Sequence, residues 1–168
     1  MRNRLLLWKT SEVCCSSTLL SSTMIKKTIT KKPKELNRST ELRKADEAFS
    51  LFIRTRDAQP YQGRAFKCIS CGKILPIEQA DNSHYLNRAN MATRFSEINC
   101  WAGCRWCNRF REGNLQGYRQ TLVKKFGEQK VLLLEAQRYA THKMSAFDLH
   151  EIYLYYRKKI KEFEYQIK

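Results

Sequence analysis

Acidic side chains are scarce in this sequence of 168 residues, and long apolar runs are missing from it. It has 16 aspartate and glutamate residues against 32 lysines and arginines, so its formal net charge is +16. Because cationic side chains release the counterions that surround a polyanion, this excess favours a polyanionic partner. No apolar run reaches the length that crosses a bilayer, so we expect a soluble protein with no membrane partner.

The sequence also lacks a secretory signal, because the apolar segment RLLLW at residues 4–8 is too short for a signal-peptide core. We therefore expect a reducing, cytosolic compartment in which cysteines stay as thiols. The basic charge leaves two alternatives open, an ordinary basic soluble protein and a protein bound to an acidic membrane surface. Nucleic acid is favoured, because the basic residues are interleaved with aromatic residues instead of lying along one amphipathic helix.

The first part of the chain divides into a tail and a helix. Residues 1–36 are predicted to be a disordered basic tail, in which residues 1–23 differ enough in composition to suggest an upstream-start artefact. A helix is predicted over residues 37–59, because apolar residues recur there at helical spacing. Ser39 or Thr40 is the expected cap of this helix.

The remainder of the chain is predicted to form one core and two further helices. Residues 60–126 have few helix signals at first, and we expect a compact core of hairpins and loops that ends in a helix stopped by Gly127. Residues 127–168 are predicted to form a C-terminal helical hairpin, and Ser145 is the expected cap of its last helix.

Four of the seven cysteines form two close pairs, each with two intervening residues. This spacing lets both sulfurs of a pair reach one ion from a single tight turn, and zinc takes four such ligands in a tetrahedron. The sequence therefore predicts a structural zinc ion held by Cys68, Cys71, Cys104 and Cys107. Free or redox-active thiols are the alternative.

Three further residues of this region need an assignment. Cys100 could replace Cys107 in a pair with Cys104, but its spacing differs from that of the first pair, so we expect a small buried side chain. Trp101 and Trp106 are predicted to pack over the zinc site, with base stacking as the alternative.

The loop between the cysteine pairs contains ADNSHYLNRANMATRFSEIN, residues 80–99. Asp81 and His84 are three residues apart and need a bend to converge, because alternate side chains of an extended segment share a face. If they converge, Asp81 could hold a divalent cation while a neutral His84 takes a proton from water, as phosphodiester hydrolysis requires. The alternative is a structural histidine.

Five segments occur in a fixed order over about residues 60–165, namely CISCG, DNSHYLNR, TRFSEIN, CRWCN and GNLQGYR. In this order they resemble the phage NinG/Rap recombination endonucleases, which are similar to the HNH (ββα-metal) nucleases and to the phage junction resolvase endonuclease VII. The resemblance implies an α+β fold, with a small zinc-stapled ββα-metal (HNH-like) nuclease core and flanking N- and C-terminal helices. It also implies a phage or prophage gene expressed in the cytoplasm of a bacterial host cell.

The resemblance implies a role for each residue of the site. His84 matches the histidine that activates water, and Asp81 matches the acidic residue of the Asp-x-x-His stretch. Asp81 and Asn108 would hold a catalytic Mg²⁺ or Mn²⁺, which takes oxygen ligands, unless Asn108 is only a helix cap. Asn99 either fixes the loop or contacts the metal. Asn114 orients the site or caps a helix turn.

One residue departs from the wider HNH pattern, and five arginines are predicted to contact phosphate. Ser83 precedes His84 where many HNH enzymes have aspartate, so the metal contact would have to come from Asp81, with Glu112 as a spare carboxylate. Phosphate contacts are predicted for five arginines, with solvated surface charge as the alternative: Arg88, Arg94, Arg105, Arg109 and Arg111.

The expected function is a metal-dependent, structure-selective DNA endonuclease that acts on branched recombination intermediates such as Holliday junctions and D-loops. The branched substrate is implied by the resemblance alone. One alternative is a non-catalytic zinc-stapled nucleic-acid-binding module, and another is an HNH nicking endonuclease of restriction or homing type. Because junction cutting often uses two active sites, we expect a homodimer formed through the C-terminal helices.

Overall fold

The computed structural model describes residues 35–166, so the predicted tail falls almost entirely outside the described residues. Within this part the chain is α+β, as expected, with two two-stranded antiparallel sheets and four α-helices. The elements follow in the order α1 (Arg38–Ala58), β1 (Ala65–Lys67), β2 (Ile74–Pro76), β3 (Ala80–His84), β4 (Cys100–Cys104), α2 (Leu115–Phe126), α3 (Glu128–Ala136) and α4 (Ala146–Gln166). A five-residue π-helical turn, Trp106–Phe110, lies between β4 and α2.

The helix α1 begins and ends close to the predicted residues, but its cap differs. Asn37 is the N-cap, and its side chain accepts a hydrogen bond from the Thr40 backbone N–H at 3.1 Å. The predicted caps were therefore wrong, because both lie inside the first turn. At α4 the prediction is confirmed, since Ser145 Oγ accepts from the Asp148 N–H at 3.2 Å while the Asp148 carboxylate accepts from the Ser145 N–H at 2.8 Å.

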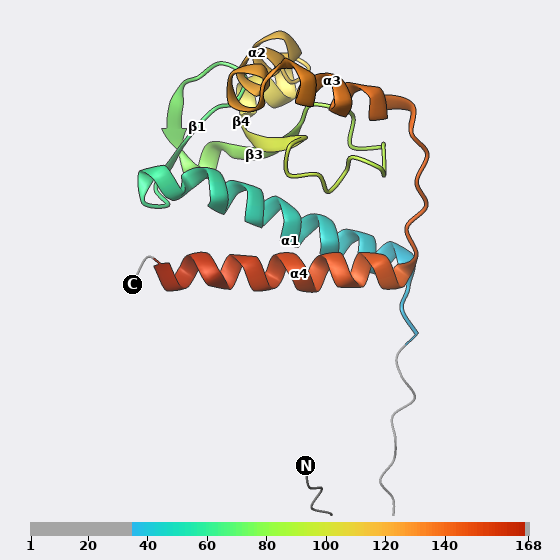
Figure 1. Ribbon diagram of the computed structural model, residues 1–168. Helices are drawn as coiled ribbons and strands as arrows, with labels where there is room; N and C mark the ends of the chain where they lie inside the picture. The colour runs from blue at the N-terminus through green and yellow to red at the C-terminus, as the bar shows by residue number, and fades with distance from the viewer. Residues whose placement is uncertain (1–34, 167–168) are drawn as a thin grey trace, which may run out of the picture. The chain divides into compact units, whose positions relative to one another are not determined.

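The helices α1 and α4 lie side by side and run in the same direction (Figure 1). Arg38 Nε donates to the Met144 carbonyl at 3.0 Å where the pair starts. Phe52 stacks on Phe163 at a centroid distance of 5.8 Å further along. The buried aromatic residues between the two helices form one of the hydrophobic clusters of the protein, and they explain the helical spacing of apolar residues in both segments.

The predicted C-terminal helical hairpin was wrong. α3 packs on α2 through a second hydrophobic cluster, whereas α4 leaves the pair and packs on α1 (Figure 1). Both α3 and α4 bury an apolar face, but each buries it against a different helix. The helix α3 ends at Ala136, and residues 137–139 form a 3₁₀ turn.

The two strand pairs place the residues of interest between these helices. β1 and β2 form a hairpin that carries the first cysteine pair in its connection. In the second sheet Asp81 pairs with Gly103 and His84 pairs with Cys100. This sheet lies between α1 on one side and the α2–α3 pair on the other (Figure 1). A Cβ at Gly103 would come within 2.8 Å of Ser83 Cβ, so only glycine allows the strands to approach this closely here.

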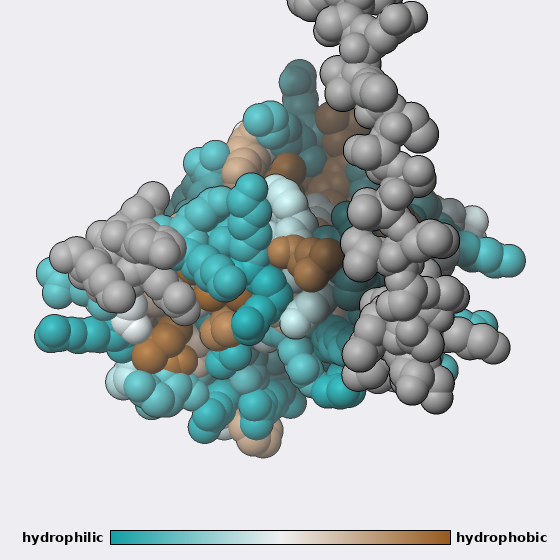
Figure 2. Space-filling view, turned by 90° about the horizontal axis from the view of Figure 1, so that it is seen from below, coloured by the Kyte–Doolittle hydropathy of each residue, from teal (hydrophilic) through white to brown (hydrophobic). Residues whose placement is uncertain are grey.

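None of the helices in residues 35–166 combines the length and the apolar character needed to cross a bilayer. Figure 2 shows the side formed by α4 as mainly hydrophilic, with small hydrophobic patches separated from one another.

Candidate active site and metal centre

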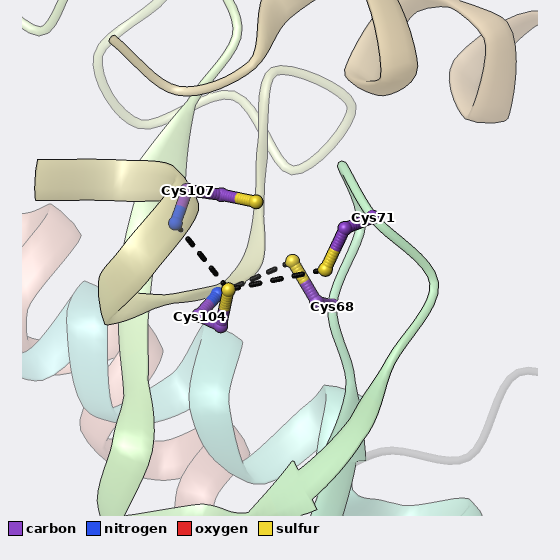
Figure 3. A group of neighbouring side chains, drawn as sticks. All are labelled: Cys68, Cys71, Cys104 and Cys107. Atoms are coloured by element: carbon purple, nitrogen blue, oxygen red, sulfur yellow. Dashed lines mark hydrogen bonds between the residues drawn. The ribbon is translucent and has the colours of Figure 1, made fainter. Parts of the chain in front are cut away.

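The two cysteine pairs meet at one point, as the spacing predicted. Cys68 and Cys71 flank the turn between β1 and β2, Cys104 ends β4 and Cys107 lies in the π-helical turn (Figure 3). All four sulfur atoms lie within 4.8 Å of one another, and the Sγ atoms of Cys71 and Cys104 are 3.9 Å apart. Zinc–sulfur bonds of about 2.3 Å in a tetrahedron give a sulfur–sulfur edge of about 3.8 Å. These four residues could hold a metal ion such as zinc.

Backbone N–H groups support the sulfur cluster. The Cys104 N–H donates to Cys68 Sγ at 3.3 Å, and the Cys107 N–H donates to Cys104 Sγ at 3.4 Å. Burial works to raise the pKa of the Cys68 thiol, but N–H hydrogen bonds bring it below 9.0. Burial raises the pKa of Cys104 and Cys107. A bound cation would compensate the cost of crowding sulfur ligands together.

Cys100 lies outside this cluster. Its side chain is fully buried, and its Sγ contacts the Arg94 carbonyl at 3.5 Å. Burial raises the pKa of its thiol well above the ordinary value. The prediction of a small buried side chain is therefore confirmed.

The sulfur cluster is joined directly to α2. Ser70, between the first two cysteines, donates from Oγ to the Gly113 carbonyl at 2.6 Å, and its own carbonyl accepts from Asn114 Nδ2 at 3.2 Å. Gly117 on α2 comes so close that an added Cβ would lie 2.1 Å from the Ser70 carbonyl oxygen. Asn114 therefore connects the first cysteine turn to the start of α2.

A groove of about 760 Å³ runs between α1 and β3, and three of the predicted catalytic residues line it. Asp81, His84 and Asn108 all line it, although the two residues on β3 are three apart. Arg88 and Arg109 line it as well. The carboxylate, the imidazole and the amide thus line one groove.

Asp81 is held by a network of hydrogen bonds at one side of this groove. Arg109 donates to both of its carboxylate oxygens, at 2.8 and 2.9 Å, and Asn108 Nδ2 donates to Oδ2 at 3.1 Å. Asn108 Oδ1 in turn accepts from Ser83 Oγ at 2.9 Å. Burial alone would raise the pKa of Asp81, but the hydrogen bonds from Arg109 and Asn108 hold it below 3.8, so the side chain is a carboxylate at neutral pH.

His84 presents one ring nitrogen with a free lone pair. Its Nε2 lies 3.1 Å from the Arg94 carbonyl, which can only accept, so Nε2 carries the proton and Nδ1 can act as an acceptor. Burial lowers the pKa of His84 below 6.5, and the charges of Arg88 and Arg94 act in the same direction, while the bond to the carbonyl opposes them. The imidazole is therefore neutral at neutral pH, as a general base must be.

The sequence matches the family described as the bacteriophage lambda NinG protein over residues 14–166. The chain belongs to the NinG family. It is 33% identical over 126 residues to Protein ninG of Escherichia phage 933W, which covers 74% of this chain and 59% of that protein. It is equally similar to Protein ninG of Escherichia phage lambda and of Salmonella phage P22, with 74% of this chain and 58% of each relative covered.

The match leaves part of the relatives without a counterpart, because this NinG-family chain spans less than two thirds of their length. All four clustered cysteines and all three groove residues lie inside the matched range. No solved structure matches the chain.

Asn99 and Arg94 of this NinG-family chain serve the loop between β3 and β4. Asn99 is fully buried, its Oδ1 accepts from the Leu86 N–H at 2.7 Å, and its Nδ2 donates to the carbonyls of Leu86 and Thr93. All of these partners are backbone groups, so Asn99 fixes the loop rather than contacting a metal. Arg94 donates to both carboxylate oxygens of Asp46 and to the Arg88 carbonyl. Its guanidinium is thus occupied inside the protein, which corrects its assignment as a phosphate contact.

The other predicted phosphate contacts are exposed. Arg88 pairs with Asp46 at 2.8 Å but remains more than half exposed, and Arg105 donates to the Glu78 carbonyl at 2.6 Å. Arg109 is half exposed in its pair with Asp81, and Arg111 is exposed. Glu112, the spare carboxylate, is exposed and does not line the groove.

Two residues were missed or misjudged at sequence level. Asp46 on α1 anchors Arg88 and Arg94 beside His84, and no local pattern could pair residues so far apart in the chain. Trp106 was expected to pack over the sulfur cluster but is 63% exposed. Trp101 is half-buried between the side chains of Arg56 and Lys125, at 4.0 and 4.3 Å from its ring centroid.

Proposed function

We propose that this NinG-family protein is a metal-dependent, structure-selective DNA endonuclease that acts on branched recombination intermediates such as Holliday junctions and D-loops. The observation that carries the proposal is the groove shared by Asp81, His84 and Asn108. A phosphodiester hydrolase needs a base for the nucleophile and a cation near the leaving oxygen. The order of β3, β4 and the helical turn also agrees with a ββα-metal nuclease core of the HNH type.

His84 would take the proton from the attacking water at Nδ1. Its Nε2–H remains bonded to the Arg94 carbonyl throughout, so the ring keeps its orientation and its tautomer. Asp46 holds Arg94 by two hydrogen bonds and thereby fixes the loop that carries this carbonyl. The base is therefore positioned by a chain of contacts that begins on α1.

Asp81 and Asn108 would hold the catalytic Mg²⁺ or Mn²⁺ through oxygen atoms, which hard cations prefer. When bound, this cation stabilises the charge that develops on the leaving oxygen. Asn108 would have to turn its amide so that Oδ1 faces the groove. Ser83 suits both orientations, because a hydroxyl that now donates to Oδ1 can instead accept from Nδ2.

Arg109 donates hydrogen bonds to both oxygens of the Asp81 carboxylate. A phosphate in the groove would offer Arg109 a second anionic partner of similar bidentate geometry. Transfer of Arg109 from the carboxylate to the phosphate would free Asp81 for the cation. Cation binding would then depend on the substrate being present.

DNA is the partner that the basic charge and the exposed arginines favour. We assign phosphate contacts to the four exposed members of the predicted set: Arg88, Arg105, Arg109 and Arg111. The cluster of Cys68, Cys71, Cys104 and Cys107 would hold a structural zinc ion that fixes the turn bearing Asn108 and Arg109. A homodimer in the cytoplasm of the bacterial host would supply two such sites for the two strands of a junction.

A second candidate function is a non-catalytic zinc-stapled nucleic-acid-binding module. The closed pair of Asp81 and Arg109 favours it, because hydrogen bonds from Arg109 and Asn108 already take three of the about four acceptor sites of this carboxylate. The binding module does not need the half-buried, neutral His84 in the same groove. An HNH nicking endonuclease of restriction or homing type would share the chemistry but would act on unbranched DNA.

The experiment compares His84→Ala with His142→Ala, an exposed histidine outside the groove. Each protein is given a labelled four-way junction with Mg²⁺. We expect His84→Ala to cut the junction about 100-fold more slowly or worse, since a general base contributes about 10²- to 10⁴-fold, while both variants bind it normally. Equal cutting by both variants would remove His84 from the mechanism. No cutting by the wild type, with Mg²⁺ or Mn²⁺, would favour the binding module.

A further inference from the structure

Two large aromatic side chains on the π-helical turn, Trp106 and Phe110, face solvent next to the groove. They are 63% and 71% exposed, and their ring centroids are 5.5 Å apart with the planes inclined by 34°. Aromatic rings of this size usually contribute to stability by being buried. Two neighbouring rings that are both exposed therefore suggest a binding role in place of a role in the hydrophobic core.

The same turn is fixed on its other sides, so the two rings are presented from a rigid support. Cys107 is buried and belongs to the sulfur cluster. Asn108 and Arg109 donate hydrogen bonds to Asp81 on β3. The rings are four residues apart and lie together on the outer side of the turn. One turn of chain thus connects the metal centre, the groove and an exposed aromatic surface.

Arginines alternate with the two rings along this segment. Arg105, Arg109 and Arg111 are all exposed. Arg105 donates a hydrogen bond to the Glu78 carbonyl, which restrains its side chain. Aromatic faces among cations are the combination that binds unpaired nucleotides, because the bases stack and the phosphates pair with the arginines. An apolar protein surface would instead force these charges out of water without partners. The chemistry of the surface therefore favours a nucleic-acid strand.

We propose that Trp106 and Phe110 form a stacking platform for unpaired bases of DNA beside the bond to be cut. The proposal rests on the proposed nuclease function and adds a source of its substrate preference. A branch point offers bases that can leave the stack at low cost, whereas a fully paired duplex must first be opened. The platform would thus hold one strand of a branched molecule in register with the groove and would discriminate against linear duplex.

The test measures binding, so it does not depend on cleavage. The double variant Trp106→Ala/Phe110→Ala is compared with Phe147→Ala, which removes an equally exposed ring (63%) on α4. The probes are a four-way junction with 2-aminopurine at the branch and an unbranched duplex of the same sequence, without added divalent cation. Wild type and Phe147→Ala should quench the 2-aminopurine. The double variant should not, and its junction affinity should fall about 5- to 100-fold while duplex affinity changes little.

Further variants distinguish base stacking from a structural role of the two rings. Trp106→Phe keeps a ring and should retain most of the junction affinity, and metal content should stay that of the wild type in every variant. Unchanged quenching and junction affinity in the double variant would overturn the platform, even if the junction is still cut. Loss of a dimer in light scattering with unchanged quenching would also overturn it. If the wild-type protein never cuts DNA but shows the expected quenching, the result would contradict the nuclease proposal and would still support the stacking platform.

Discussion

Hydrogen bonding determines which atom of His84 is available to take a proton. The Arg94 carbonyl fixes the proton on Nε2 and leaves Nδ1 as the acceptor. Sequence could identify His84 as a candidate but could not indicate which nitrogen is free, because the partner is a backbone carbonyl ten residues later. The tautomer and the orientation of the His84 ring are therefore set by the loop that Asn99 and Arg94 hold in place.

The lowered pKa of His84 leads to a prediction about pH. Because the folded protein holds the neutral imidazole, the rate of junction cutting should be constant near neutral pH and should fall only as pH drops through a pKa below 6.5. The contribution of this group to folding has the same sign. It is present above the unfolded pKa of about 6.5 and is lost as pH falls, because the unfolded chain binds the proton more readily.

A single-turnover rate profile from pH 5 to 8, recorded with a folding control by circular dichroism, checks this prediction. An acidic limb with its midpoint above 6.5 would mean that a nearby carboxylate raises the pKa of His84, against the present assignment. A rate that is independent of pH over the whole range would mean that no such base acts in the limiting step.

At the scale of elements, the sequence was most informative where a pattern repeats locally. The apolar spacing of α1 and α4 and the two short cysteine pairs predicted helices and a four-sulfur cluster, and the structure contains both. Local patterns could not tell which helices pack together, because both α3 and α4 have an apolar face and only tertiary contacts assign it. The helical hairpin over residues 127–168 failed for this reason.

The residues of the groove also divide into those that a local pattern predicts and those that only tertiary contacts assign. Asp81 and His84 were predicted from a short segment and a resemblance, whereas Asp46 on α1 could not be, since its contacts with Arg88 and Arg94 cross more than 40 residues of chain. Trp106 was misjudged because aromatic residues are usually buried. Nothing in the local sequence indicates that its turn has a buried side already filled by Cys107.

The sulfur cluster gives a prediction at this scale. Purified protein should contain about one zinc ion per chain, and Cys68→Ser should lose it and unfold at a lower temperature, because the free energy of metal binding contributes to folding. Cys100→Ser is the matched control, since Cys100 is buried but lies outside the cluster. It should keep the metal even if the buried hydroxyl lowers stability. Metal analysis and thermal unfolding measure both effects, and loss of the metal in Cys100→Ser would show that the ligand set is wrong.

At the scale of the whole molecule, the net charge supports the proposed nucleic-acid partner more clearly than the fold does. The net charge of +16 and a groove bordered by exposed arginines suit a DNA partner. The part of the α4 side that is visible in Figure 2 is mainly hydrophilic, with separate hydrophobic patches, so it offers little support for the expected dimer through the C-terminal helices. Two sites on one junction would then require dimerisation elsewhere or on the DNA itself.

The central claim is that one groove with a carboxylate, an amide and a neutral imidazole cuts branched DNA. The most direct measurement is the single-turnover rate at which the wild-type protein cuts a four-way junction with Mg²⁺, beside that for an unbranched duplex of the same sequence. We expect the junction to be cut faster by about tenfold or more, a difference of about 1.4 kcal/mol in activation free energy. Equal rates would contradict selectivity for branched DNA, and no cutting of either substrate would contradict the nuclease.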